Sequence, residues 1–239
     1  MTSSARSLVV TFLVALMGTT AWMATVDAEA VDAKPRKIKK KSSKGFSKNS
    51  PLAGFKGAYV LSGTGESELS GESGSSTTTE YEDDATYGVN GHFLFPVAQN
   101  LRVGGSVWLW PKWDVKVDGQ PSETEGEDAL GLDLNIMAEY ALDFGKIDGF
   151  AYAEAGVAML FPPEPEDENV QTEPETGIGY NAGGGVGGGF PISRQLALRV
   201  DVKFTVYSIT TTTDIGDRSL DSTFSGNRLT LNAGVAFGL

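Results

Sequence analysis

The feature that most limits what this chain can fold into is a series of stretches in which apolar and polar residues alternate. The clearest runs from Leu130 to Leu142, where every second residue is apolar and Asp133, Asn135 and Glu139 lie between them. A period of two residues is the pattern of a β-strand with one apolar and one polar face. No stretch after residue 50 repeats with a helical period, so we predict an all-β fold.

Seven further stretches share this pattern, and each is long enough for the roughly 9–11 residues with which a tilted strand crosses a bilayer. The eight stretches cover residues 54–63, 86–95, 101–110, 130–142, 149–161, 177–190, 196–207 and 228–239. Short connectors at 96–100, 143–149 and 191–195 alternate with long ones at about 64–85, 111–128, 162–176 and 209–226. Such alternation predicts an antiparallel up-and-down eight-stranded transmembrane β-barrel with four long external loops. A soluble lipocalin-like binder would instead place its charged face outside.

The charges of the predicted strands gather on their polar faces. Ten ionisable groups on the non-lipid face suit a narrow lumen filled by side chains, as in small barrels, and we expect them to form a structural network that does no chemistry. They are Lys56, His92, Arg102, Asp133, Glu139, Glu154, Arg199, Asp201, Lys203 and Arg228.

The alternation of faces along a strand, here called parity, also assigns a face to some uncharged residues. In the first stretch it places Ser62 on the polar face together with Lys56. Trp108 and Trp110 fall on the polar face too, and either a bulge near the following loop or a lumen lining would explain them.

The N-terminus has the pattern of a secretory signal at residues 1–30. Arg6 precedes the apolar run from Leu8 to Val26, and the small residues around Ala28 and Ala30 fit cleavage. The alternative is a membrane anchor, because the run reaches spanning length. Residues 31–50 carry eight basic residues, which predicts a disordered periplasmic arm, either a plain spacer or a contact for an anionic envelope polymer. We expect no nucleic-acid role behind a secretory signal.

The barrel domain at 51–239 is strongly acidic. It holds ten Lys and Arg against 28 Asp and Glu, and 22 of these acids fall in the four long connectors. The dense carboxylates of residues 80–84 and 164–168 raise the idea of a divalent cation, but neither segment matches a known calcium loop, and we expect no metal site.

The segment GGGVGGG, Gly183 to Gly189, matches the G-x-G-x-x-G pattern of a dinucleotide-binding turn. That pattern requires a following helix, and Pro191 closes the segment instead. We therefore expect no nucleotide and no other cofactor. Parity points the four odd-numbered glycines inward, where we expect them to make room for Arg199, Asp201 and Lys203.

The signal, the eight alternating stretches, the sixth stretch leading to FPISRQLALRVDVKF and the C-terminal LTLNAGVAFGL together resemble the small outer-membrane barrels of the OmpA transmembrane domain, OmpW and opacity-protein class. The resemblance covers residues 51–239. It implies a monomer in the bacterial outer membrane, surrounded by lipids and lipopolysaccharide. It also implies recognition of the last strand by the barrel-assembly machinery, although here Leu239 is the last residue and the aromatic Phe237 precedes it.

The resemblance leaves several roles to weigh. We expect a structural or surface-interaction role in envelope integrity or adhesion. The alternatives are a narrow small-solute channel and a lipid-A-modifying enzyme. Such an enzyme needs a histidine near the outer leaflet, whereas the one histidine, His92, lies close to the periplasmic turn at Pro96. We therefore expect no enzyme.

Overall fold

The structure, a computed structural model, describes residues 50–71, 76–117, 120–121, 129–143, 147–162, 172–215 and 218–239. The predicted signal and all of the basic arm except Ser50 lie outside these ranges. Within these ranges no helix has both the length and the hydropathy to span a membrane.

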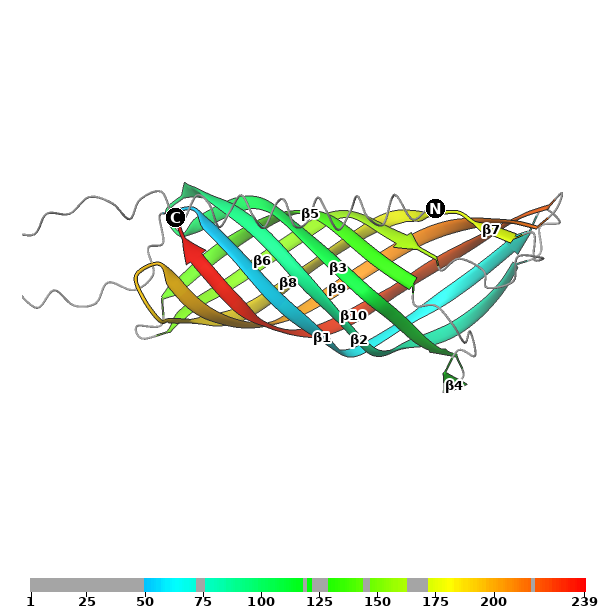
Figure 1. Ribbon diagram of the computed structural model, residues 1–239, viewed down its shortest axis with the longest axis horizontal. Helices are drawn as coiled ribbons and strands as arrows, with labels where there is room; N and C mark the ends of the chain where they lie inside the picture. Colours follow the sequence, from blue (N-terminus) through cyan, green and yellow to red (C-terminus); the bar gives the residue numbers. More distant parts are fainter. Residues whose placement is uncertain are drawn as a thin grey trace, which may run out of the picture.

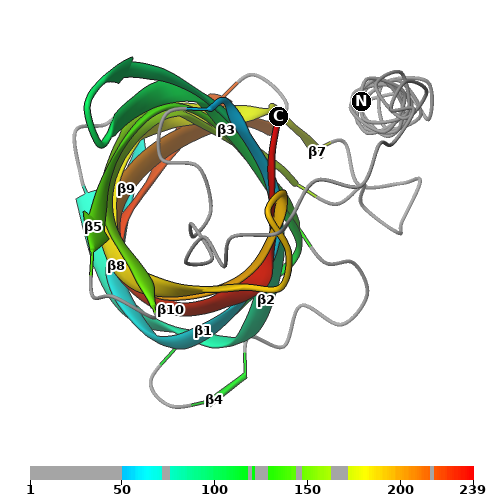
Figure 2. The same ribbon diagram turned by 90° about the vertical axis from the view of Figure 1, so that its left-hand side faces the viewer.

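The described chain forms one antiparallel sheet that closes into a ring (Figures 1 and 2). Each long strand pairs with the next long strand along the chain, which is an up-and-down topology. The eight long strands are β1 (Leu52–Gly71), β2 (Ser76–Ala98), β3 (Leu101–Val117), β5 (Ala129–Asp143), β6 (Asp148–Phe161), β8 (Gly177–Pro191), β9 (Leu196–Ile215) and β10 (Arg218–Gly238). The short β4 (Gln120–Pro121) pairs with β3, and the short β7 (Thr172–Pro174) pairs with β9.

The ring is closed by the first and last strands. β1 and β10 pair from Leu52 opposite Gly238 to Gly71 opposite Leu220. The end of the chain is held further because the Leu239 amide donates to the Pro51 carbonyl over 2.9 Å. The C-terminus therefore lies at the end of the barrel that carries the three short turns (Figure 1). Closure leaves neither β1 nor β10 as an open sheet edge.

The outward face of the barrel is apolar over a band of limited height. On β9 the outward residues from Leu198 to Val206 are all apolar, and Ser208 and Thr210 follow them. The nine consecutive residues from Leu198 to Val206 match the length with which a tilted strand crosses a bilayer. Ile136 on β5 is 73% exposed, as expected for a side chain that faces lipid. This arrangement confirms the predicted all-β, eight-stranded transmembrane barrel.

Two of the four predicted long loops are instead strand. β1 and β2 stay paired out to Ser70 opposite Ser76, and β9 and β10 stay paired out to Ile215 opposite Arg218. The segments at 64–85 and 209–226 are therefore mostly long hairpins that continue the barrel wall. The reason is local, since β-branched threonines favour strands and their hydroxyls link neighbouring strands. Thr210 and Thr223, for example, lie 3.1 Å apart through their hydroxyl oxygens.

The expectation that Ser62 faces inward is wrong. The register of β1 against β10 shifts between Val60 and Ser62, which is a β-bulge. A bulge adds one residue to one strand and reverses the facing of every residue after it. As a result Leu61 and Ser62 are both exposed, and Gly63 is the next buried residue.

The interior has three apolar clusters along the barrel. One at the short-turn end contains Leu52, Leu94, Met137 and Phe150. A second contains Ala58, Val60, Trp108 and Trp110, and a third near the opposite end contains Ala158, Leu160, Tyr207 and Ile209. The charged groups of the lumen lie among these clusters.

Candidate functional site: the lumen network

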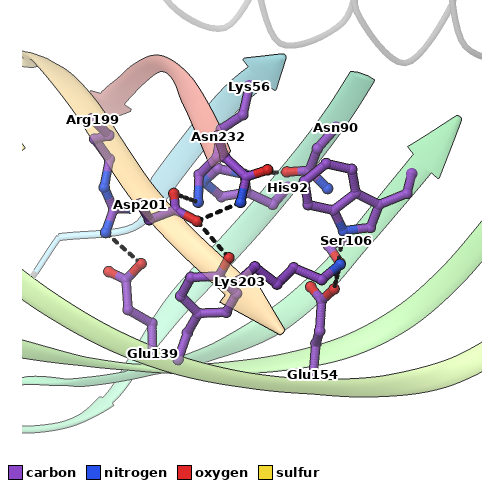
Figure 3. A network of polar contacts seen from close by, with 12 residues as sticks. Lys56, Asn90, His92, Ser106, Glu139, Glu154, Arg199, Asp201, Lys203 and Asn232 are labelled. Atoms are coloured by element: carbon purple, nitrogen blue, oxygen red, sulfur yellow. Dashed lines mark hydrogen bonds and ion pairs between the residues drawn. The ribbon is translucent and has the colours of Figure 1, made fainter. Parts of the chain in front are cut away.

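The structure places all ten predicted lumen groups on the inward face. Nine are buried, and Asp133 is half-buried. They come from seven of the eight long strands, because each contributes inward side chains at every second position. Figure 3 shows that most of them point toward one another across the barrel. Three carboxylates, Glu139, Glu154 and Asp201, each contact several donors, and each carboxylate with its donors is called a hub below.

Glu139 on β5 joins two arginines. Its Oε1 accepts from the Arg102 Nη1 over 3.0 Å, and its Oε2 accepts from the Arg199 Nη2 over 2.6 Å. The Glu139 side chain is fully buried. Arg199 also stacks over the Phe150 ring, with 3.5 Å between the guanidinium carbon and the ring centroid. Because β3, β5 and β9 supply these groups, this hub ties distant parts of the wall together.

Asp201 on β9 is the second hub. Its Oδ2 accepts from the Lys56 Nζ over 2.6 Å, and its Oδ1 accepts from the Tyr152 hydroxyl over 2.6 Å and from the Asn232 amide over 2.7 Å. The side chains of Lys56 and Asp201 are 1% and 0% exposed. The Lys56 ammonium also lies 4.7 Å from the centroid of the Tyr152 ring. A buried carboxylate therefore has donors on both oxygens, which offsets part of its desolvation cost.

Glu154 on β6 is the third hub. It forms an ion pair with Lys203, and it accepts from the Trp108 indole over 3.0 Å and from the Ser106 hydroxyl over 3.1 Å. The Lys203 ammonium lies 4.1 Å from the centroid of the Trp108 ring. Since Trp108 is 1% exposed, a large ring and an ion pair fill the same cross-section of the barrel.

The remaining predicted groups flank these hubs. Asp133 accepts from the Trp110 indole over 2.9 Å, and the Arg228 guanidinium stacks over the same ring at 4.7 Å. The His92 Nδ1 lies 2.9 Å from the Asn90 amide oxygen, so this histidine is part of the lumen packing. Both tryptophans line the lumen, which resolves the two placements that parity left open.

Several members of the network were not among the predicted residues. Tyr152, Asn232, Ser106 and Asn90 all donate to it or accept from it. The alternation offered a signal for each of them, because each lies an even number of positions from an ionisable inward residue on its strand. Hydroxyl, phenol and amide donors are neutral at pH 7, so the pattern of charges alone does not mark them.

The inward glycines of β8 make room for rings as well as for charges. A Cβ on Gly185 would lie 2.7 Å from the Tyr152 ring. One on Gly187 would lie 2.4 Å from the Val200 carbonyl oxygen and 2.5 Å from the Asp201 Cβ. The predicted crowding by Asp201 is therefore present at Gly187, while at Gly185 it is an aromatic ring that needs the space. No helix follows the segment, since residues 177–191 are one strand.

The chemistry open to this arrangement is that of a filled polar core. Every cation of the three hubs contacts a carboxylate, and tryptophan, tyrosine and phenylalanine rings occupy the space between. Among the described residues no group of three His, Asp or Glu side chains could hold a metal ion. Glu80 and Glu82 are exposed on the outer surface, and residues 164–168 lie outside the described ranges.

Comparison with known proteins shows the fold. The structure is similar to the outer membrane protein OprG from Pseudomonas aeruginosa, with a TM-score of 0.57 and 12% identity over 82% of this chain and 98% of that one. It is also similar to the outer membrane protein AlkL in lipid bilayers, with a TM-score of 0.53 and 16% identity over 88% of this chain and 97% of that one. No protein-family model matches the sequence, and no curated protein matches it.

Proposed function

We propose that the chain is an integral outer-membrane protein whose role is structural and interactive, in envelope integrity or surface contact. The outward apolar band supports membrane residence. Beyond this band the β1–β2 and β9–β10 hairpins expose hydroxyls and carboxylates, among them Glu66, Glu68 and Glu80. Hairpins held by the barrel wall form a rigid platform for surface contact. Closure of β1 on β10 supports a monomer.

The observation that carries this proposal is the filled lumen. Three hubs and two stacked indole rings, 5.4 Å apart between centroids, occupy the interior. Two cavities between described residues of the barrel have volumes of about 20 and 30 Å³, which suit single water molecules. These sizes favour a structural barrel over a small-solute channel. Liposomes that contain the refolded protein are expected to swell no faster in small sugars than empty liposomes, and faster swelling would support the channel instead.

A non-enzymatic role is part of the proposal. The His92 side chain is buried, with 6% exposure, and it is hydrogen-bonded to Asn90. It lies on β2, four residues before Pro96 at the short turn. This place is remote from an outer-leaflet substrate. Deacylase and acyltransferase assays on lipid A with the His92→Gln variant and the parent protein are expected to show the same background.

The proposed partners are lipids and lipopolysaccharide along the apolar band, and the barrel-assembly machinery at the last strand. Phe237 on that strand is 37% exposed on the outward face, where a partner can reach it. An anionic envelope polymer for the basic arm at 31–50 remains a proposal from charge alone.

Orientation and membrane residence can be tested with single cysteines, because the chain has none. Thr78 is exposed on the β1–β2 hairpin, and Arg194 is exposed in the short turn between β8 and β9. In intact cells a membrane-impermeant maleimide is expected to label Thr78→Cys and not Arg194→Cys, while lysed cells label both. Labelling of Arg194→Cys alone in intact cells would show that the barrel has the opposite orientation. Release of the protein from membranes by carbonate would refute membrane insertion.

The surface role can be tested with a matched pair of strains that lack the native gene. One expresses the parent chain, and the other carries Gln at Glu66, Glu68, Glu80 and Glu82, which are exposed on one face of the β1–β2 hairpin. We expect the variant to restore resistance to detergents and to lose surface contact. If neither strain differs from the deletion strain in detergent resistance or attachment, the proposed role is wrong.

A further inference from the structure

A cavity whose wall contains both apolar and polar residues lies inside the barrel, between the three hubs and the long hairpins. Its volume is about 20 Å³, and its polar lining comes from Asp133, Asn181, Thr205, Tyr207 and Arg228. Asn181 belongs to β8 and Thr205 to β9, so the cavity is bounded by neighbouring strands of the wall. The three hub carboxylates Glu139, Glu154 and Asp201 do not line this cavity.

Two side chains that face this cavity have no hydrogen-bond partner among the described residues. Both amide atoms of Asn181 and the hydroxyl of Thr205 are unpaired. Asn181 is 3% exposed and Thr205 is 7% exposed. Buried polar atoms are almost always paired with protein or with ordered water, because an unpaired one keeps its full desolvation cost.

The cavity also limits what can occupy it. A volume of about 20 Å³ holds about one water molecule and nothing much larger. The Arg228 guanidinium disfavours a bare cation, and the Asp133 carboxylate disfavours an anion. The occupant must be able both to donate and to accept, since Asn181 presents an amide oxygen and an amide nitrogen.

We propose that this cavity is a binding site for one buried, ordered water molecule, held by the Asn181 amide and the Thr205 hydroxyl. The water completes the hydrogen bonds that the strands leave open at this level. The water allows polar residues to remain buried between the lumen network and the long hairpins without an open channel.

The chain offers a matched control in Thr230. Its hydroxyl is also buried and unpaired, and it points inward from β10, but Thr230 lines neither cavity. Thr205→Val and Thr230→Val therefore make the same chemical change, one at the proposed site and one away from it. Both keep the shape and the β-branching of the side chain.

The test counts long-lived water molecules by oxygen-17 magnetic relaxation dispersion on the refolded full chain in detergent micelles. We expect Thr205→Val to have one fewer long-lived water than the parent protein, and Thr230→Val to have the same number. In urea, Thr205→Val should unfold at a lower midpoint than the parent, because the remaining partners lose their bridge. Thr230→Val should unfold at an equal or higher midpoint, since it removes an unpaired hydroxyl.

Two outcomes would overturn the proposal. One is an equal number of long-lived waters in the parent and in Thr205→Val, both being folded by heat-modifiable gel mobility. The other is a rise in the urea midpoint for both valine variants, which would show that both hydroxyls are dry. If Thr205→Val fails to fold, the same count is made with Asn181→Leu, which has a similar volume, removes both amide atoms and is also expected to lose the water.

Discussion

The ion pair between Lys56 and Asp201 gives a quantitative test of the lumen network. Asp201→Asn keeps the shape of the side chain and an oxygen that accepts from Tyr152 or Asn232, so it removes mainly the charge. It leaves the Lys56 ammonium buried without a counter-ion. Removing one partner of a buried pair costs about 3–5 kcal/mol. Solvent screening does not reduce this value, because the two side chains are 1% and 0% exposed.

The rings around Lys56 lower the expected cost. Its ammonium lies 4.7 Å from the Tyr152 centroid and 5.3 Å from the Phe150 centroid. Cation–π contacts of this kind contribute about 0.5–2 kcal/mol and remain in the variant. We therefore expect Asp201→Asn to lower the free energy of unfolding by about 2–4 kcal/mol. Lys56→Met, which leaves the carboxylate with its two neutral donors, should lower it by a similar amount.

The double variant separates pairing from general damage. Lys56→Met with Asp201→Asn contains neither charge, and replacing both members of a buried pair is often close to neutral. We expect it to be at least about 2 kcal/mol more stable than the sum of the two single effects predicts. Urea titration of the barrel in phospholipid vesicles, followed by tryptophan fluorescence and gel mobility, measures all four proteins. Strictly additive effects would refute the pairing of these residues in the folded barrel.

Two further predictions concern the packing of the wall and its outer face. Gly187→Ala places a Cβ 2.4 Å from the Val200 carbonyl oxygen and should lower the free energy of unfolding by about 1–3 kcal/mol. The control is Gly57→Ala, whose Cβ would lie 4.0 Å from its nearest neighbour. This control should leave the free energy of unfolding unchanged or raise it by about 0.4–1 kcal/mol. Equal urea midpoints for the two variants would contradict this account of the glycines. Ile136→Arg places a charge in the apolar band and should cost about 2–4 kcal/mol, while Thr210→Arg beyond the band should cost about 0–1 kcal/mol. The same titration measures both, and equal costs would show that the band is misplaced.

Much of the fold could be predicted from residue parity. The alternation places Lys203 inward and Phe204 outward on β9 without any knowledge of neighbouring strands, and the structure agrees. Parity fails at Ser62, because a bulge adds a residue that no local pattern of polarity marks. The sequence predicts loops at 64–85 and 209–226, where the structure has mostly paired strands whose outward residues are polar. The polar outward residues there mark where the apolar band ends, while the strands themselves continue beyond it.

The candidate site was only partly predictable. Parity could collect the ten ionisable residues on one face, but it could not say that Arg199 reaches Glu139 while Lys56 reaches Asp201. Those partners lie 60 and 145 positions apart in the sequence. Tyr152 was missed because a phenol on the polar face is not a charge, and yet it bonds directly to Asp201.

By itself, the sequence determined the strand type, the number of long strands and the facing of most residues, because a strand reverses its side chains at every residue and the bilayer demands apolar residues on one side. The tertiary structure alone decided which charges pair and where the cavity lies. Those depend on the height of each side chain in the lumen. That height is set by the hydrogen-bond register of all eight strands around the closed ring, to which every turn and bulge contributes.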